Sequence, residues 1–311
     1  MAGSRIELHR CNNDDCMGRC NKEMRKIVSE NDLCKITNSE QDSLPVRCVG
    51  EWAEEKIYLL YQYFGIFTRG MKNKWKEINY IEICSGPGRC INRCCSQELD
   101  GTALSIIKHS DFCYIHKALF FDYDEKVVDI LNRRIKNMEV DNAMAIIADY
   151  NNPKDLCSIL QRYCSYNSLN LVLVDPTDCS VPFDLIVNLK KALHHIDMII
   201  NVATGTDFSR NIPMAFDNTE RAKKYINFLG DDSFFSSSEN QILCKNKNYS
   251  VLRNNFREAY QKSMSKIGYS EFRITQIKHY YDILLASSNK KATEFWDKAQ
   301  NIEFDGQREL F

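Results

Sequence analysis

Short unbroken apolar runs alternate with amphipathic segments along most of the chain. Apolar residues recur three and four positions apart from Ala53 to Phe67, and again from Val127 to Ile135. This spacing predicts two helices. The unbroken apolar runs predict strands at residues 79–83, 117–122, 143–148, 171–174 and 196–202. Strands of this kind are typical of parallel sheets that helices cover on both faces. The pattern therefore predicts an α/β fold with a mostly parallel, doubly wound sheet.

The carboxyl-terminal third has a different order of elements. A helix is expected at residues 249–267, then strands at 272–277 and 280–286, and a closing helix at 291–298. The two strands are separated by a short polar turn and should pair antiparallel. An antiparallel carboxyl-terminal hairpin at the sheet edge indicates the topology of S-adenosylmethionine-dependent methyltransferases rather than a plain dinucleotide-binding fold.

Two segments differ in composition from the alternating core. Residues 1–47 are polar and carry several cysteines, so we expect an amino-terminal segment followed by a Rossmann-like domain at 48–311. Residues at about 203–248 form a polar insertion with one short helix predicted near residues 221–229. The insertion either shapes a substrate site or is a mobile solvated loop, and the sequence leaves both interpretations open.

A glycine turn directly follows the first strand of the predicted sheet. Glu82, Gly86 and Gly88 have the spacing Glu-x-x-x-Gly-x-Gly, and Ser85 lies within the turn. Glycine permits positive φ and lets a ligand approach the backbone closely. A dinucleotide fingerprint requires a third glycine where this chain has Ile91. The turn therefore favours S-adenosylmethionine over NAD, although a purely structural turn has the same appearance.

Acidic residues follow three further strands of the predicted sheet. Asp122, Asp149 and Asp175 each stand where an apolar run ends. Ligands of such sheets bind beyond the carboxyl ends of the strands, so these acids and Glu82 should gather at one edge. A carboxylate after the second strand can accept from both ribose hydroxyls of an adenosine. Each acid has a simpler interpretation as a helix cap, and either Asp122 or Asp124 suits that role.

The charge balance excludes a strong general attraction to polyanions. The 311 residues include 41 basic and 42 acidic side chains, for a net charge of −1. A nucleic-acid partner therefore remains uncertain. The chain also lacks an apolar run long enough to cross a bilayer, so we expect a cytoplasmic protein with no membrane partner.

Four cysteines near the amino terminus are candidate metal ligands. Cys11, Cys16, Cys20 and Cys34 would supply the four thiolates that structural zinc prefers. No two of them form a close Cys-x-x-Cys pair. The segment is thus either a zinc site or a loosely attached tail with reduced thiols.

Several ordered blocks resemble the three-Cys-motif partner protein family, TcmP. They are residues 49–56 (VGEWAEEK), 80–88 (YIEICSGPG), 100–104 (DGTAL), 174–177 (VDPT), 210–211 (RN) and 280–287 (YYDILLAS). The resemblance covers about residue 48 to the end. It implies a Rossmann-like class I methyltransferase fold and a neighbouring three-cysteine-motif protein of the radical S-adenosylmethionine type. This chain has Cys84-Ser85 where Phe-Ala is common in the family, and Thr177-Asp178 where an aromatic residue and glycine are common.

Two functions of different classes remain after this comparison. The first is a methyltransferase with S-adenosylmethionine as cofactor and an unidentified acceptor. Its candidate catalytic residues are Asp175, Pro176 and Asp178, with Asp175 best placed to orient a nucleophile or remove its proton. Cys179 is more simply a buried thiol than a nucleophile. The second function is a non-catalytic partner subunit that retains the methyltransferase fold.

Overall fold

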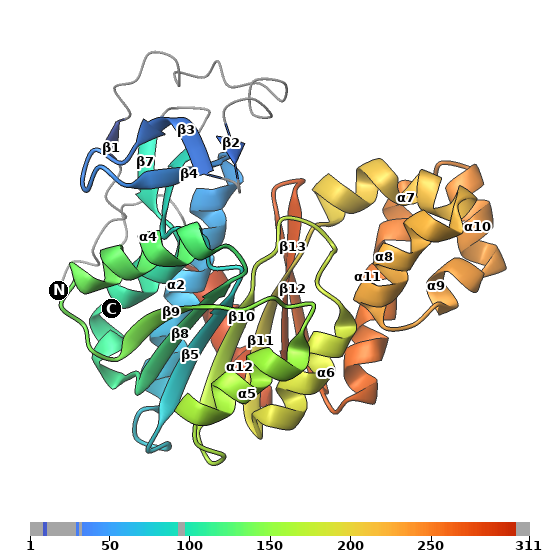
Figure 1. The fold of residues 1–311 in the computed structure, drawn as a ribbon. Coiled ribbons are helices and arrows are strands. Elements are labelled where there is room, and N and C mark those ends of the chain that lie inside the picture. Colours follow the sequence, from blue (N-terminus) through green and yellow to red (C-terminus); the bar gives the residue numbers. More distant parts are fainter. Residues whose placement is uncertain (1–8, 11–28, 31–32, 93–96, 303–311) are drawn as a thin grey trace. The chain divides into compact units, whose positions relative to one another are not determined.

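The computed structural model describes residues 9–10, 29–30, 33–92 and 97–302. These residues divide into two compact units. The first contains the described residues of Met1–Ile147 and Phe295–Phe311, and the second is Ala148–Glu294. Parallel strands flanked by helices occur in both units, as Figure 1 shows. The α/β class with mostly parallel core strands, expected from the sequence, is confirmed.

Three parallel strands form the frame of the first unit. They are β5 (Ile78–Ile83), β8 (Lys117–Asp122) and β9 (Ala143–Ile147), neighbours in that order. All six residues of β5 and the four central residues of β8 are buried, which agrees with their mostly apolar sequences; Asn79 and Glu82 are the polar residues buried in β5. Asp122 at the end of β8 pairs in register with Ile147 at the end of β9. The polar residues that follow these strands therefore emerge at one edge.

Helices accompany these strands, and α2 and α4 among them occupy the positions that the periodicity predicted. They are α2 (Trp52–Met71), α3 (Thr102–Ile107), η1 (Ser110–Tyr114), α4 (Glu125–Lys136) and α12 (Lys290–Gln300). The ring of Phe64 in α2 meets Tyr80 of β5 edge-on, with ring centroids 5.8 Å apart. Asn132 of α4 exchanges two hydrogen bonds with the backbone of Ala145 in β9.

The first unit also contains a small second sheet that the sequence did not predict. Its strands are β1 (His9–Arg10), β2 (Ser29–Glu30), β3 (Leu33–Asn38), β4 (Pro45–Val49), β6 (Arg89–Asn92) and β7 (Gln97–Asp100), in the order β1-β7-β6-β4-β3-β2. β4 runs parallel to β6, and the other described pairs are antiparallel. Val46 packs on Ile91, while Leu44 packs against Val127 and Ile130 of α4. Part of the polar amino-terminal segment therefore joins the strands that follow the glycine turn.

The second unit has two parallel strands and the predicted antiparallel hairpin. Its strands are β10 (Leu169–Val174), β11 (His195–Val202), β12 (Glu271–Ile277) and β13 (Tyr281–Ser287), and β13 lies between β11 and β12. β10 and β11 are parallel, whereas β13 is antiparallel to both of its neighbours. The connecting helices are α5 (Pro153–Tyr163) and α6 (Phe183–Ala192).

The insertion after β11 is helical rather than a solvated loop. It contains η2 (Thr204–Phe208), α7 (Ser209–Asp217), α8 (Thr219–Leu229), α9 (Ser233–Ser236) and α10 (Ser238–Lys245), and leads into α11 (Tyr249–Lys266). Phe208, Tyr225 and Phe256 are buried, and the ring centroids of Phe208 and Phe256 lie 4.5 Å apart. Packed aromatic rings order these helices because they bury large apolar surfaces.

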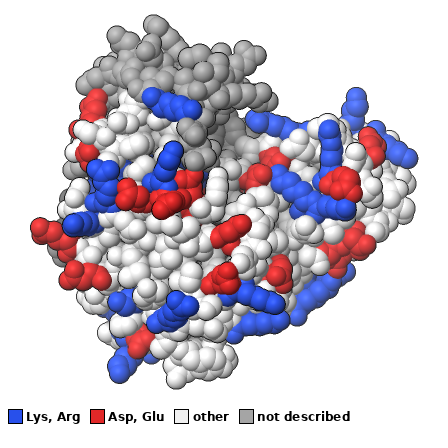
Figure 2. All heavy atoms as spheres, in the orientation of Figure 1, with Lys and Arg blue, Asp and Glu red and all other residues white. Residues whose placement is uncertain are grey.

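Charged side chains are mixed over the described surface. Figure 2 shows acidic and basic groups interspersed on the face that it draws. This distribution agrees with the near-zero net charge. Among the helices of the described residues, none is long and apolar enough to span a bilayer.

Candidate functional site

The glycine turn after β5 has the positive φ angles that its sequence predicted. The φ values are 66° at Cys84, 64° at Gly86 and 87° at Gly88. A Cβ atom at Gly88 would stand 2.8 Å from Cδ1 of Leu131 and 3.0 Å from Cγ of Leu104. Position 88 therefore requires glycine for packing as well as for backbone conformation. Cys84 holds a conformation that disfavours side chains, as residues at ligand-binding sites often do.

Asp122 joins the end of β8 to the glycine turn. Its Oδ2 accepts the main-chain N–H of Gly86 at 3.0 Å, and its Oδ1 accepts that of Asp124 at 3.2 Å. Burial raises the pKa of Asp122, and these two hydrogen bonds together with the charge of Arg47 oppose that rise. Asp124 is the cap of α4, because its Oδ1 accepts from the N–H groups of Lys126 and Val127. Of the two acids that the sequence offered as the cap of this helix, Asp124 is the one that caps it.

Ser85 places a second polar group in the same turn. Its main-chain N–H donates to the carbonyl of Phe121 at 3.0 Å, which ties the turn to β8. The Ser85 side chain is buried, and its hydroxyl has no hydrogen-bond partner among the described residues. A buried hydroxyl without a partner is costly, so a ligand atom that pairs with it gains affinity.

Glu82 is a fully buried carboxylate that accepts hydrogen bonds from its own strand and from α3. Its Oε2 accepts from the hydroxyl of Tyr80 at 2.9 Å, and its Oε1 accepts from the hydroxyl of Thr102. Thr102 is the first residue of α3. Because both oxygens accept protein hydroxyls, Glu82 connects β5 to α3 beneath the turn. The sequence predicted that Glu82 contacts the cofactor. In the structure both carboxylate oxygens accept hydrogen bonds from protein hydroxyls.

Arg47 of β4 brings a positive charge to the turn. Its Nη1 lies 3.3 Å from the place that a Cβ of Gly86 would occupy. The same guanidinium lowers the pKa of the Asp122 carboxyl against the effect of burial. Sequence reasoning did not find Arg47, since it belongs to a strand for which residues 33–47 gave no periodic signal.

Two large apolar side chains flank the carboxyl ends of β8 and β9. Tyr123 is 62% exposed and Ile147 is 49% exposed, whereas the strand residues next to them, Asp122 and Ile146, are half-buried. Tyr123 directly follows Asp122, whose register partner is Ile147. Exposed apolar groups at a strand end suit a flat ring of a ligand. The sequence carried a signal for Tyr123, an aromatic residue between two aspartates, which the predictions did not use.

The other predicted acids lie in the second unit. Asp149 is exposed, and its Oδ1 accepts from the backbone N–H and the side-chain amide of Asn151. These contacts join residues two positions apart and form a local turn. Asp175 accepts at Oδ1 from the amide of Asn201 at 2.9 Å. The same Asn201 amide donates to the carbonyl of Pro176 at 3.1 Å, so one side chain of β11 orients this loop.

Asp178 is ion-paired with the helical insertion. Lys224 of α8 lies 2.8 Å from Oδ2 of Asp178 and 2.7 Å from Oδ2 of Asp207. Burial lowers the pKa of Lys224, but the two carboxylates outweigh that effect and raise it. The Oδ2 of Asp207 also accepts the N–H of Cys179 at 3.0 Å. Lys224 therefore fixes the loop after β10 to α8.

The cysteines differ in how far the structure describes them. Cys11, Cys16 and Cys20 lie outside the described residues, whereas Cys34 packs beside Val46 and Ile91. Among the described residues, no group of three or more His, Cys, Asp or Glu side chains is placed to hold a metal ion. Cys179 is fully buried, and burial raises the pKa of its thiol well above the ordinary value. This agrees with a buried thiol rather than a nucleophile.

The first unit thus gathers four kinds of group around one turn. They are a carboxylate at Asp122, an unpartnered hydroxyl at Ser85, positive-φ backbone at Gly86, and the apolar side chains of Tyr123 and Ile147. A carboxylate accepts well from a pair of hydroxyls, and apolar side chains pack against a flat ring. The set suits a nucleoside-containing ligand.

Several solved structures resemble this chain at low sequence identity. No protein-family model and no curated protein matches the chain. Among solved structures, human methyltransferase-like protein 13 in complex with SAH is 9% identical with a TM-score of 0.42, over 80% of this chain and 92% of that one. M. jannaschii TYW2 in complex with AdoMet is 9% identical with a TM-score of 0.39, over 83% and 86%. A methyltransferase from Aquifex aeolicus is 12% identical with a TM-score of 0.38, over 76% and 98%.

Proposed function

We propose that the first unit binds S-adenosylmethionine at the glycine turn and that the protein is a methyltransferase. One observation carries the proposal: the N–H of Gly86 donates to Asp122, so the carboxylate after β8 lies against the turn after β5. Each feature alone is common in α/β proteins. Together with the spacing from Glu82 to Gly88 they match the needs of an adenosine linked to an amino acid.

Different residues of the first unit contact the ribose, the adenine and the amino-acid portion of the proposed ligand. Asp122 accepts from the ribose hydroxyls, and Tyr123 and Ile147 pack on the adenine ring. The Ser85 hydroxyl and the backbone at Gly86 receive the amino-acid portion. When bound, S-adenosylmethionine supplies a methyl group on a positively charged sulfur, so the chain has only to bind, orient and exclude water.

Residues of the second unit are proposed to act on the methyl acceptor. Asp175 is the candidate group for orienting the acceptor and taking its proton, and the Asn201 amide holds its carboxylate. Pro176 shapes the same loop. Asp178 is paired with Lys224, which suits anchoring the loop better than proton transfer.

Titration calorimetry tests the binding half of this proposal. S-adenosylmethionine and S-adenosylhomocysteine should both bind to the full chain, and ATP and NAD should not. For NAD the reason is that Ile91 stands where a dinucleotide fingerprint has its third glycine. Equal binding of all four compounds, or binding of none, would contradict the proposal. Transfer is then followed with methyl-labelled S-adenosylmethionine and candidate acceptors.

A second candidate function is a non-catalytic partner subunit of a three-cysteine-motif protein. The ion pair from Lys224 to Asp178 favours it, since a carboxylate held by a cation is a poor general base. This function predicts cofactor binding without transfer, together with a stable complex with the neighbouring radical S-adenosylmethionine-type protein. Size-exclusion chromatography of the two purified proteins separates the candidates, because a methyltransferase acting alone needs no such complex.

A further inference from the structure

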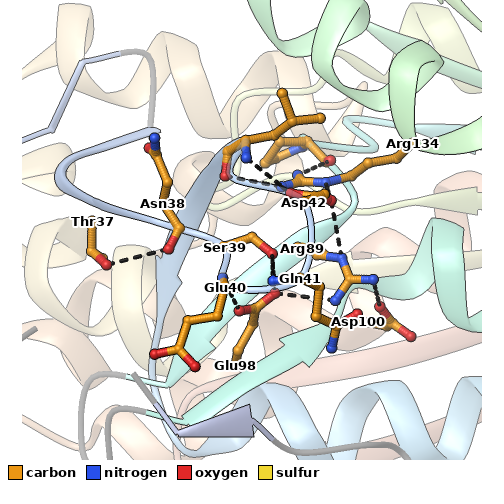
Figure 3. A network of polar contacts seen from close by, with 12 residues as sticks. Thr37, Asn38, Ser39, Glu40, Gln41, Asp42, Arg89, Glu98, Asp100 and Arg134 are labelled. Atoms are coloured by element: carbon orange, nitrogen blue, oxygen red, sulfur yellow. Dashed lines mark hydrogen bonds and ion pairs between the residues drawn. The ribbon is translucent and has the colours of Figure 1, made fainter. Parts of the chain in front are cut away.

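Arg134 of α4 lies where the β3–β4 hairpin meets the glycine turn. Its Nε donates to Oδ2 of Asp42 at 2.8 Å and its Nη2 to Oδ1 at 3.1 Å, so the pair is bidentate. Nη2 also donates to the carbonyl of Leu44 at 3.2 Å, and Nη1 donates to the carbonyl of Pro87 at 2.6 Å. Figure 3 shows Arg134 beside Asp42 in this network. One buried guanidinium thus bonds the hairpin and the turn together.

Both carbonyls of the Pro87–Gly88 segment are fixed by the protein. Arg134 holds that of Pro87, and the N–H of Gly101 donates to that of Gly88 at 2.6 Å. In a trans peptide the N–H points opposite to the C=O. Fixing the Pro87 carbonyl on the guanidinium therefore directs the N–H of Gly88 away from Arg134. The orientation of this peptide, between two positive-φ glycines, depends on Arg134.

A second arginine keeps Asp42 in place. Nη1 of Arg89 donates to Oε1 of Glu98 at 3.1 Å, and Nε of Arg89 lies 3.4 Å from Oδ2 of Asp42. Glu98 in turn accepts from the Ser39 hydroxyl and from the N–H of Glu40 at 3.0 Å. The turn between β3 and β4 is therefore bound to Arg89 and Glu98, which follow the glycine turn in sequence, as well as to Arg134.

The surroundings make these bonds selective for arginine and aspartate. The side chain of Arg134 is 2% exposed and that of Asp42 is 13% exposed. Burial raises the pKa of Asp42, and the hydrogen bonds from Arg134 and the Leu44 backbone outweigh that effect, so the net pKa is lowered. The guanidinium fork matches a carboxylate and still has a donor for the Pro87 carbonyl, which a lysine ammonium does not reproduce.

We propose that the β3–β4 hairpin is part of the cofactor site. Arg134 is the positioning residue, because it links the conformation of the hairpin to the conformation of the glycine turn. The inference rests on the proposed function, because it concerns the site that binds S-adenosylmethionine. It makes ligand binding and hairpin order mutually dependent. Since such coupling is reciprocal, a ligand on the turn stabilises the hairpin as much as the hairpin favours the ligand.

The second unit offers a matched control pair. Arg257 of α11 donates to both oxygens of Asp282 in β13, at 2.7 and 2.6 Å. The side chains are 19% and 1% exposed. This pair has the same bidentate chemistry, with a somewhat more exposed arginine, and it joins α11 to β13. The hydrogen bonds described for Arg257 go to Asp282 and Asn254.

The test compares Arg134→Lys and Asp42→Asn with Arg257→Lys and Asp282→Asn in the full chain. Calorimetry with S-adenosylmethionine is run at a temperature where circular dichroism shows every variant folded. The first two substitutions should weaken binding about tenfold or more, as expected for coupled sites. The control pair should stay within about twofold of the wild type. The inference is overturned if Arg134→Lys binds as the wild type does, or if both pairs weaken binding equally.

Hydrogen exchange measured by mass spectrometry separates this inference from the proposed function. In the ligand-free protein, Arg134→Lys should speed exchange in peptides covering residues 84–89, and Arg257→Lys should not. S-adenosylmethionine should slow hydrogen exchange at residues 39–49 in the wild type. In Arg134→Lys it should not slow exchange there. A wild type that binds no S-adenosylmethionine refutes the proposed function, while unchanged exchange at 84–89 in Arg134→Lys refutes the positioning role alone.

Discussion

The N–H of Gly86 donates to Oδ2 of Asp122 over 3.0 Å, although the two residues stand 36 positions apart in the sequence. This bond brings the carboxyl ends of β5 and β8 into one site. It leaves Oδ1 of Asp122 accepting only the N–H of Asp124 among the hydrogen bonds described for it, at 3.2 Å. A carboxylate oxygen has room for more than one donor, so Asp122 retains acceptor capacity for hydroxyl groups.

Replacing Asp122 by alanine should weaken S-adenosylmethionine binding about tenfold to a hundredfold. Charge-assisted hydrogen bonds of this kind contribute roughly 1.5 to 3 kcal/mol. The matched control is Asp124→Ala, which removes the cap of α4 and should lower the free energy of unfolding by about 1 kcal/mol with little change in affinity. Calorimetry and denaturant titration measure the two effects. Equal affinity losses in both variants would show that Asp122 acts only through the fold.

Acidification should weaken binding before it unfolds the protein. Burial raises the pKa of Asp122 above the ordinary carboxyl value, and its protonated form accepts hydroxyl donors less well. Affinity should therefore fall as the pH drops toward this raised pKa, and Asp122→Asn should lose that pH dependence. Affinity for S-adenosylhomocysteine between pH 8 and 5 is the measurement. An identical pH profile in the variant would assign the effect to another group.

Asp175→Ala should spare cofactor affinity and abolish methyl transfer. The residue is held by Asn201 and is proposed to act on the acceptor, so its substitution should lower kcat rather than cofactor affinity. Asp178→Asn serves as the comparison, because it removes the ion pair with Lys224 beside the same loop. Single-turnover transfer measures both variants once an acceptor is identified. Full activity in Asp175→Ala would reduce that residue to a structural role.

Asp197 is expected to destabilise the fold above mildly acidic pH. Burial raises its pKa to about 6, and the Ser287 hydroxyl donates to it. An aspartate with a raised folded-state pKa costs stability as the pH rises from about 4 to about 6, because folding then opposes ionisation. Asp197→Asn should raise the free energy of unfolding at pH 7.5 by about 1 to 2 kcal/mol, with no gain below pH 4. Urea unfolding at both pH values tests the sign; a loss at pH 7.5 would contradict it.

The zinc site remains a prediction that elemental analysis can test. Protein purified without chelator should carry about one zinc per chain if Cys11, Cys16, Cys20 and Cys34 form a four-thiolate site. Cys34→Ser should then lower the zinc content, whereas Cys244→Ser should not. Absence of zinc from the unsubstituted protein would leave the interpretation of a tail with reduced thiols.

The sequence predicted those elements whose residues carry the fold signal locally. β5 and β8 are mostly apolar because their side chains are buried, and the carboxyl-terminal hairpin follows from two strand-like segments on either side of a polar turn. The strands β3, β4, β6 and β7 escaped prediction. Their polar residues are satisfied by partners far away in sequence, as in the bond from Ser39 to Glu98, and no local pattern reports such pairing.

Site residues followed the same division. The positive-φ turn and its proximity to the end of β8 were predictable from spacing and topology, but the assignment of the helix cap to Asp124 rather than Asp122 required the hydrogen bonds of both carboxylates. Arg134 and Arg47 were not predictable. Arg134 has the sequence context of an ordinary basic residue near a helix end, and its buried contacts with Asp42 and Pro87 arise only in the folded chain.

A thermodynamic cycle between Asp122 and the ribose hydroxyls tests the central claim most directly. The affinities of wild type and Asp122→Ala are measured for S-adenosylhomocysteine and for its 2′,3′-dideoxy analogue. If Asp122 accepts from those hydroxyls, the wild type should bind the analogue more weakly than S-adenosylhomocysteine, whereas Asp122→Ala should bind the two compounds with similar affinity. The difference between these two effects, the coupling energy, should be roughly 1.5 to 3 kcal/mol. Additive losses, with a coupling near zero, or no measurable binding of S-adenosylhomocysteine to the wild type, would contradict the account.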